Sequence, residues 1–357
     1  MIRQKKVILK SAKTRIMKTC KLIFTLSGIL LFLSSCDHSV SMKTIVHEDG
    51  SLDKTIELET DSVGAKNFIG IGSSTNWQVV TTVKDTIRKT DDKKFITTYT
   101  RHFTSATEAN KELATPSDTT FRIRSEFDKK FRWFYTYISY SDTYLAINRL
   151  KHPTTDYFTQ EDYTFIDRLP AEGKSISKAD SLYLDGLNDK IFETYATRAI
   201  FEEYYSRMVK VLDVGTNKSW IDTLNNNKEK LFESLKNEKD MEDIASLFPI
   251  SGISNIPISK EQLKQIELEV ETLTDFASTA GNGKYVHRID MPGEVVNSNA
   301  DSVAANVAYW QPSATKFLLK DYKMVVESRQ LNSWTVIVSI GFIVLFISIL
   351  IRSKSRF

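Results

Sequence analysis

The 357-residue sequence predicts an α+β fold: a mostly antiparallel sheet with a large helical insertion, followed by one C-terminal transmembrane helix. Three observations support this fold class. The hydrophobic pattern alternates over residues 40–150, as in half-buried strands. It takes a helical period over about 153–281 and alternates again after Gly283. An uncharged apolar run over 334–351 is then long enough to cross a bilayer.

The N-terminus has the layout of a bacterial lipoprotein signal. Basic residues precede an apolar run over 22–33, which is too short to span a bilayer of about 30 Å. Ser34 and Ser35 then precede Cys36, and this ending resembles a lipobox. The resemblance implies that residues 1–35 are a signal peptide, cleaved before Cys36, and that Cys36 is lipidated. Residues 1–16 hold six basic side chains and no acid, which leaves Met1 and Met17 as alternative translation starts.

The C-terminus has the layout of a membrane anchor. Eighteen residues over 334–351 rise about 27 Å as a helix, enough to cross the hydrocarbon core. Trp334 lies where an interfacial aromatic residue is expected, and the tail 352–357 carries three basic residues and no acid. The positive-inside rule therefore places the tail in the cytoplasm. We expect a transmembrane helix over 333–351 and an extracytoplasmic domain over 36–332, on the periplasmic side of a bacterial cell membrane.

Net charge argues against a nucleic-acid partner. The formal charge of +3 includes eight basic residues before Cys36 and three in the tail. Without these eleven, 37 basic residues stand against 45 acidic ones, so the exposed domain carries about −8. Such a domain lacks the basic footprint that nucleic acid requires. Cys20 is lost with the signal, and the lipidated Cys36 leaves the mature chain without a thiol pair for a disulfide.

Three hairpins and a short helix are predicted before residue 150. The strand pairs are 42–46 with 52–58, 77–88 with 94–103, and 119–127 with 131–144. Asp49-Gly50 between two alternating runs is a strong hairpin signal, and a polar turn over 90–92 joins the second pair. A short helix is expected over 105–113. Apolar residues on both faces of 131–144 predict a central strand covered by helices on one side.

Helices fill the predicted insertion, about 153–281. A weak capping box at Ser177 opens a helix that continues to Met208. A second helix spans 220–235 and is expected to break at 225–227, an Asn-Asn-Asn run. Ser259 and Gln262 form a better capping box for a third helix, which should stop before Gly281. The later strands 285–291, 302–310 and 315–328 are expected to join the first sheet, which would bring both membrane tethers to one side.

The segment 291–299, Met-Pro-Gly-Glu-Val-Val-Asn-Ser-Asn, and the segment 307–310, Val-Ala-Tyr-Trp, precede the transmembrane helix. Together they resemble the end of bacterial LppM-type lipoprotein domains, and the hairpin around Asp49-Gly50 fits the first strands of those domains. The resemblance covers about a third of the chain, and the helical insertion has no counterpart in it. It implies an envelope protein that binds lipids or other hydrophobic ligands and has no catalytic residues.

We expect no metal or cofactor site. The mature histidines do not fall at the close spacing of a metal site; they are His38, His47, His102, His152 and His287. The histidines at 102 and 287 lie in predicted strands and are expected at a sheet surface. Zinc binding would need histidines and carboxylates gathered from distant segments, which the sequence does not reveal.

We also expect no catalytic residues. The sequence has no G-x-S-x-G element and no supported S-x-x-K element, and Ser177-Lys178 and Ser259-Lys260 are explained by helix starts. The segment 70–73, Gly-Ile-Gly-Ser, lacks the lysine of a P-loop and is interpreted as a turn. Five carboxylates could supply an acid and a base; they are Glu161, Asp162, Asp167, Glu202 and Glu203. Of these, Glu202 and Glu203 lie on the polar side of an amphipathic helix and are expected on solvated surface.

Two functions remain open at this point. The leading hypothesis is a non-enzymatic interaction or assembly module with an envelope protein partner, anchored in the membrane at both ends. The alternative is a carrier or sensor of a lipid or other hydrophobic ligand. It rests on the resemblance and on aromatic residues that could line a cavity opposite the strand 131–140; they are Tyr195, Phe201, Tyr204 and Tyr205. Core packing explains the same aromatic pattern.

Overall fold

The computed structural model describes residues 38–354, with gaps at 61–75, 85–93, 117–118, 214–217, 238–246, 251, 254 and 282. The described residues form two compact units. The sheet unit comprises 38–146, 170–174 and 283–354, and the helical unit comprises 147–169 and 175–281. Both lipobox residues and Cys36 lie outside the described residues.

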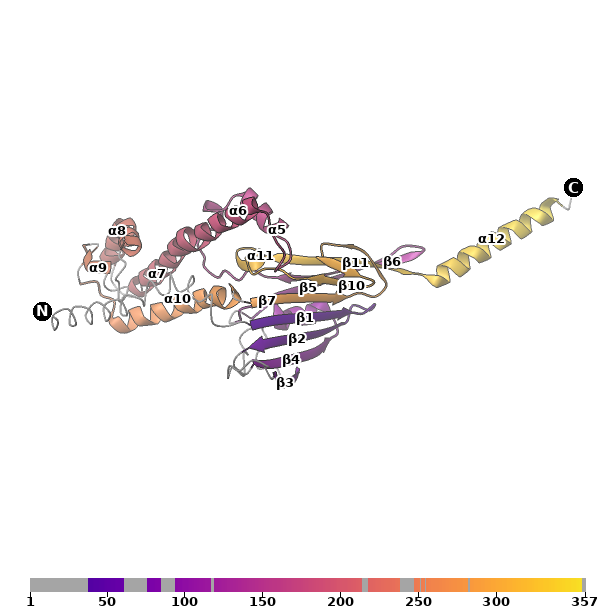
Figure 1. Cartoon of the computed structure of the whole chain (residues 1–357), viewed down its shortest axis with the longest axis horizontal. Helices are drawn as coiled ribbons and strands as arrows, with labels where there is room; N and C mark the ends of the chain where they lie inside the picture. The colour runs from indigo at the N-terminus through magenta and orange to yellow at the C-terminus, as the bar shows by residue number, and fades with distance from the viewer. Residues whose placement is uncertain are drawn as a thin grey trace. The chain divides into compact units, whose positions relative to one another are not determined.

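The sheet unit contains two sheets (Figure 1). The larger has the order β3 (Gln78–Lys84), β4 (Lys94–Phe103), β2 (Leu52–Thr60), β1 (His38–Val46), β7 (Gly283–Asp290), β10 (Val307–Trp310) and β9 (Ser302–Ala304). The smaller has the order β5 (Ile123–Phe131), β6 (Tyr135–Tyr144), β11 (Tyr322–Leu331) and β8 (Glu294–Ser298). Neighbouring strands are antiparallel except for β1 and β7, which are parallel.

The predicted fold class and the first hairpin are confirmed. Asp49-Gly50 joins β1 to β2, and Gly50 adopts φ +90°, a conformation that glycine reaches without steric cost. The second strand pair is confirmed as β3 and β4, while its turn lies outside the described residues. The helix expected over 105–113 is α4 (Ala106–Leu113), and the Ser105 side chain caps it by accepting from the Glu108 N–H.

Three strand predictions require correction. The late strands divide between two sheets instead of joining one, because β11 pairs along its length with β6. The run 302–310 is a hairpin of β9 and β10, since Ala305 adopts φ +54° and turns the chain. The run 315–328 begins as the helical turn α11 (Thr315–Leu318), whose Phe317 and Leu318 are buried, before β11 starts.

The third hairpin also turns later than expected. Phe131 ends β5, whereas it was expected to start the returning strand. Arg132 and Tyr135 exchange backbone hydrogen bonds of 2.8 and 3.0 Å, so that Trp133 and Phe134 form a two-residue tip. The tip contains no Gly, Asn or Asp to mark it in the sequence.

Alternation along the strands separates a buried face of the large sheet from an outer face. On β2, Leu52, Lys54, Ile56 and Leu58 are buried, while Asp53 and the other intervening side chains are at least partly accessible. The same period holds along β1. The buried face contributes to an aromatic core in which Phe121, Tyr285 and Phe317 pack with ring centroids 5.0–5.8 Å apart.

The helical unit contains η1 (Thr154–Asp156), α5 (Gln160–Arg168), α6 (Lys178–Asp189), the π-helical η2 (Lys190–Tyr195), α7 (Ala196–Asp213), α8 (Lys218–Asn237), α9 (Leu247–Ile250) and α10 (Lys260–Gly281). Ser177 caps α6, and Ser259 with Gln262 forms the predicted capping box of α10. The expected break at 225–227 is wrong: α8 is continuous, and Asn225 accepts a hydrogen bond from the Tyr205 hydroxyl. Packing of α7 against α8 therefore outweighs the weak helix propensity of the asparagines.

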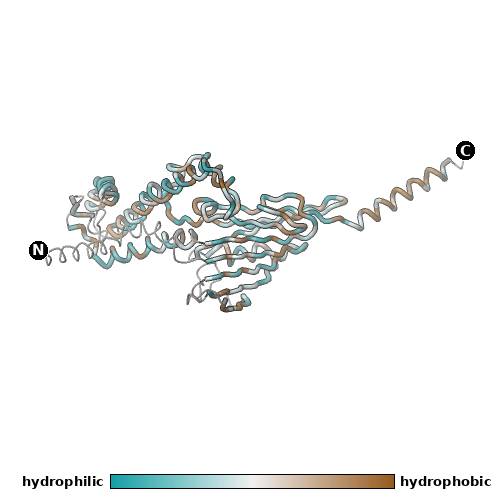
Figure 2. The backbone as a smooth tube through the Cα atoms, in the orientation of Figure 1, coloured by the Kyte–Doolittle hydropathy of each residue, from teal (hydrophilic) through white to brown (hydrophobic). Residues whose placement is uncertain are grey.

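A long apolar helix, α12 (Ser333–Lys354), ends the described chain. Its segment Ser333–Arg352 is long and apolar enough to cross a membrane, with a mean hydropathy of 2.7, and only 6% of its most apolar stretch is buried by protein. Figure 2 shows α12 as an almost continuously hydrophobic segment. These properties agree with the expected membrane helix over 333–351.

Candidate functional site: a buried polar network and a juxtamembrane clamp

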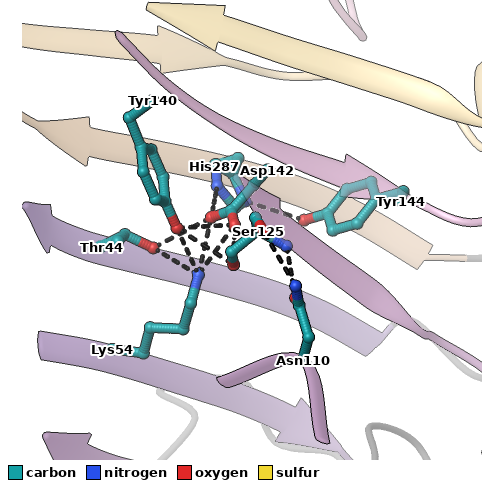
Figure 3. A network of polar contacts seen from close by, with 8 residues as sticks. All are labelled: Thr44, Lys54, Asn110, Ser125, Tyr140, Asp142, Tyr144 and His287. Carbon is teal, nitrogen blue, oxygen red and sulfur yellow. Dashed lines mark hydrogen bonds and ion pairs between the residues drawn. The ribbon is translucent and has the colours of Figure 1, made fainter. Parts of the chain in front are cut away.

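A network of charged and hydroxyl side chains centres on Asp142 of β6 (Figure 3). Its carboxylate accepts hydrogen bonds of 2.6 to 3.1 Å from five side chains; they are Thr44, Lys54, Ser125, Tyr140 and His287. The donors come from β1, β2 and β7 of the large sheet and from β5 and β6 of the small one. The network therefore links the two sheets across their shared interior.

Further bonds fix the orientation of these donors. The Lys54 ammonium also donates to Thr44 Oγ1 and the Tyr140 hydroxyl, both at 3.0 Å. His287 Nδ1 lies 3.2 Å from the Tyr144 hydroxyl. Because Asp142 can only accept, His287 donates from Nε2, and its Nδ1 can accept from the tyrosine. Asn110 of α4 makes two bonds to the backbone of Ser125, of 2.7 and 2.9 Å, and so fastens α4 to β5.

The electrostatics favour one anion, one cation and a neutral imidazole. Burial opposes ionisation of Asp142, but the Lys54 ammonium and the His287 N–H outweigh it and hold the pKa of that carboxyl well below its usual range. Burial lowers the pKa of His287, and Asp142 only partly offsets this effect. Burial also raises the pKa of the Tyr140 and Tyr144 hydroxyls. Burial also lowers the pKa of Lys54, and the Asp142 carboxylate opposes that shift. Because two bonds of 2.8 and 2.9 Å join Lys54 Nζ to the Asp142 carboxylate, we describe the network as an ion pair surrounded by neutral donors.

The residue types would suit acid–base chemistry, but their position does not. The side chains of Lys54, Asp142 and His287 are 0% exposed, so they lie away from solvent in the described part of the chain. Each bonds to other members of the network. The arrangement accordingly fixes the packing of the two sheets, and we assign it a structural role.

The sequence contained one signal for this network. Lys54 occupies an inward position between Leu52 and Ile56, where a lysine requires a buried partner. That partner lies 88 residues away on another sheet, beyond the reach of pattern reasoning. His287, expected at a sheet surface, is fully buried. The correction has a physical basis, because Asp142 and Tyr144 satisfy both ring nitrogens.

A second constellation joins the β5–β6 hairpin tip to the start of α12, and we call it the juxtamembrane clamp. Asn332 donates from its side-chain amide to the Arg132 and Trp133 carbonyls, at 2.8 and 3.2 Å, and accepts from the Thr136 hydroxyl at 2.8 Å. The Asn332 N–H donates to the Phe134 carbonyl at 2.8 Å. These four bonds connect the last residue before α12 to the hairpin.

Aromatic side chains extend the clamp onto the helix itself. The Trp133 indole N–H donates to Ser339 Oγ at 2.9 Å, about two turns into α12. Phe131 stacks on Trp334 with ring centroids 6.1 Å apart and an interplanar angle of 11°. Phe131, Trp133 and Phe134 are nevertheless 46–56% exposed. Exposed aromatic residues beside a membrane helix are typical of the membrane–water interface.

Beside the clamp lies an open recess of about 910 Å³. Its apolar lining includes Phe131, Leu331 and Trp334, and its charged lining includes Lys129 and Arg329. Arg329 forms an ion pair with Glu294 at 3.0 Å, and Lys129 donates to the Glu48 carbonyl at 2.8 Å. The recess thus has both apolar and charged walls.

The carboxylates considered as acid–base candidates have partners of their own. Asp162 completes a capping box with Thr159 and accepts hydrogen bonds from Lys190 and Tyr183. Burial raises the pKa of Asp162, but these three partners outweigh burial and lower it to about 2. Glu202 pairs with Arg198 and Lys228. Glu203 was expected on solvated surface but is 2% exposed, because it accepts from the Lys151 N–H and pairs with Arg207.

The remaining predicted residues add no chemistry. Glu161 lies in the exposed first turn of α5, and Asp167 is an exposed residue of the same helix. The segment 70–73 lies outside the described residues. On the aromatic helix, Phe201 and Tyr205 are buried in the core of the helical unit, and Tyr195 packs on Tyr157 and Phe158. Core packing within that unit therefore accounts for these side chains.

No protein-family model matches the chain, and no curated protein shows a significant sequence match. Among solved structures, the chain is similar to the NMR structure of the folded domain of LppM from Mycobacterium tuberculosis. The two share 7% sequence identity, with a TM-score of 0.26, over 84% of this chain and 92% of the LppM domain. This domain is of the lipoprotein type that the sequence resembles, but a TM-score of 0.26 supports no argument about function.

Proposed function

We propose that the chain is a bacterial envelope lipoprotein, anchored at both ends, whose sheet unit acts as a non-enzymatic interaction module. The observation that carries this proposal is the edge strand β3. Among the described residues it is the last strand at one side of the large sheet, and its Val79, Val80 and Val83 are 53–60% exposed. An exposed apolar edge strand can pair with an extended segment of another protein by strand addition.

The other long edge of the sheet unit differs in character. Edge strand β5 carries Asp128, Lys129 and Lys130 near its end, and such charges discourage edge-to-edge pairing. Strand β3 has one charged residue, Lys84, at its end, against the three near the end of β5. The contrast favours a partner strand at β3, where backbone groups would supply affinity and the valines would contact alternate side chains of the partner.

The membrane anchors would keep this edge at a fixed place in the envelope. The juxtamembrane clamp supports a defined connection between the sheet unit and α12. Lipidation of Cys36 would add the second anchor, since acyl chains contribute about 0.8 kcal/mol per buried CH₂. Metabolic labelling with a palmitate analogue should mark the wild-type chain and fail to mark Cys36→Ser. Equal labelling of both would refute the lipid anchor.

Site-specific photocrosslinking in native membranes tests the interaction module. A photoreactive residue at Val80 should give a discrete adduct with one envelope protein. The matched control is Leu182 of α6, which is 64% exposed and lies in the other unit. Absence of an adduct at position 80, or the same adducts at both positions, would contradict the proposal.

The recess beside the clamp favours a second candidate function, binding of a lipid. Apolar walls with Lys129 and Arg329 close by could contact the acyl chains and phosphate of one phospholipid. Mass spectrometry of the purified chain should then detect one lipid species at about one molecule per chain, reduced in Lys129→Gln. Equal amounts of lipid on the wild type and on Lys129→Gln would exclude the recess as the lipid-binding site.

A further inference from the structure

Two histidines and an aspartate converge on the outer face of the large sheet, outside both constellations described above. His47 Nε2 lies 2.7 Å from Asp53 Oδ2, and His102 Nδ1 lies 2.7 Å from Asp53 Oδ1. The two imidazole rings are 6.2 Å apart between centroids. One potential ligand atom from each side chain falls within 4.8 Å of the other two.

The strand register and the hairpin turn create this cluster. Asp53 of β2 is the direct cross-strand neighbour of His102 of β4, so their side chains project from the same face. His47 follows β1, and its N–H donates to the Ser51 carbonyl at 3.0 Å while its own carbonyl accepts from Gly50 at 3.1 Å. These bonds fix the backbone of His47 at the closed end of the hairpin. All three ligands therefore lie on hydrogen-bonded backbone.

The cluster is accessible to an ion in solution. Asp53, His47 and His102 side chains are 37%, 42% and 58% exposed. They point away from Lys54, the next residue on β2, which belongs to the buried network. The cluster is thus open to solvent and separate from the residues that hold the sheets together.

We propose that His47, Asp53 and His102 bind a divalent transition-metal ion, with Zn²⁺ the best match. Two imidazole nitrogens and one carboxylate form the three-ligand set of sites that leave a fourth position open. Oxygen-seeking Ca²⁺ and Mg²⁺ fit two nitrogen ligands poorly. The sequence did not predict this site because its ligands come from three segments whose approach depends on the sheet register.

Metal binding requires only a small local change. Ligands at about 2.0–2.2 Å from a tetrahedral zinc ion are about 3.4 Å from one another. The present contacts of 2.7 Å between Asp53 and the histidines would open by less than 1 Å. The two histidine nitrogens, now within 4.8 Å of each other, would close to the same spacing. The three side chains are partly exposed and can adjust by rotation about their side-chain bonds. The carboxylate also supplies one negative charge toward the cation.

Isothermal titration calorimetry with ZnCl₂ tests the site directly. The full chain, purified in detergent without a histidine tag, should bind one ion with a dissociation constant of about 10 μM or tighter. His47→Gln and His102→Gln should each weaken binding by at least about tenfold. Loss of a residue that only supports a metal ligand already weakens affinity by about that factor. Lowering the pH should weaken binding in the wild type, because imidazole must be neutral to coordinate.

Glu57→Gln is the matched control, since it removes one carboxylate from the exposed face of the same strand, four residues from Asp53. It should bind Zn²⁺ as the wild type does, and circular dichroism should show the same fold in every variant. A wild type that binds no ion tighter than about 100 μM would overturn the proposal and leave a hydrogen-bonded cluster. Equal binding by the wild type and both histidine variants would also overturn it, because the ion would then occupy another site.

Discussion

Replacing Asp142 with asparagine tests the assignment of the buried network as the tie between the two sheets. The substitution keeps the side-chain volume but removes the carboxylate charge that pairs with Lys54, and both side chains are 0% exposed. Breaking a buried ion pair in this way costs about 3–5 kcal/mol. Burial already lowers the pKa of Lys54, so the lysine can limit that cost by losing its proton once Asp142 is gone. We therefore expect a loss of about 3–5 kcal/mol.

Lys54→Met is the informative companion variant. It removes the cation but leaves Asp142 with the hydroxyl donors and His287. Burial is the main cause of the lowered pKa of His287 and Lys54 adds to it, so removal of Lys54 favours uptake of a proton by the imidazole beside Asp142. We expect Lys54→Met to lose about 1–2 kcal/mol, less than Asp142→Asn, because no unpaired charge remains buried.

Urea unfolding of the full chain in detergent, followed by near-ultraviolet circular dichroism, measures both losses. Trp310 is fully buried in the sheet unit, with its ring centroid 6.2 Å from that of His287, and so reports on this region. A loss below about 1 kcal/mol for Asp142→Asn, or a larger loss for Lys54→Met than for Asp142→Asn, would show that the network does not tie the two sheets together.

Three further predictions concern acid, backbone conformation and the clamp. Folding lowers the pKa of both Asp142 and His287, so the unfolded state binds more protons than the folded state. The free energy of unfolding should therefore fall as the pH drops below about 6.5. A urea midpoint that stays constant from pH 7 to pH 4 would contradict this. Gly293 has φ +85°, and a Cβ there would clash with the Arg329 carbonyl. Gly293→Ala should therefore lower the free energy of unfolding, measured in urea, by about 1–3 kcal/mol. Gly186→Ala is the control, because Gly186 lies on an open helix surface and its substitution should not destabilise the chain. Asn332→Ala removes three side-chain hydrogen bonds and should speed amide exchange in the hairpin tip at 132–135, measured by mass spectrometry; unchanged exchange would exclude the clamp.

Features that depend on neighbouring residues could be predicted from the sequence. Asp49-Gly50 identified the first hairpin because a positive φ favours glycine. Ser259 and Gln262 marked the start of α10 because each satisfies a backbone N–H near the helix N-terminus. The length and apolar character of 333–351 likewise identified α12 as a helix able to cross a membrane, without reference to the rest of the fold.

Features that depend on tertiary partners could not be predicted in this way. Several strands have a similar alternating pattern, so the sequence does not show that β11 pairs with β6. This pairing places β11 in the second sheet. Lys54 signalled a buried partner but could not identify Asp142. Asp53 and His102 become neighbours only through the β2–β4 register. Most of the candidate functional residues therefore emerged from the structure, although their chemical types were visible in the sequence.

We propose that the clamp holds the sheet unit at the bilayer surface while edge strand β3 remains in water. Nitroxide labels at Phe134→Cys and Val80→Cys, in the full chain reconstituted in bilayers, measure both positions, with the unsubstituted chain as the labelling background. Paramagnetic relaxation should show preferential access of lipid-soluble oxygen at position 134 and of a water-soluble nickel complex at position 80. A label at 134 as accessible to the nickel complex as the label at 80, or a label at 80 shielded within lipid, would contradict the account.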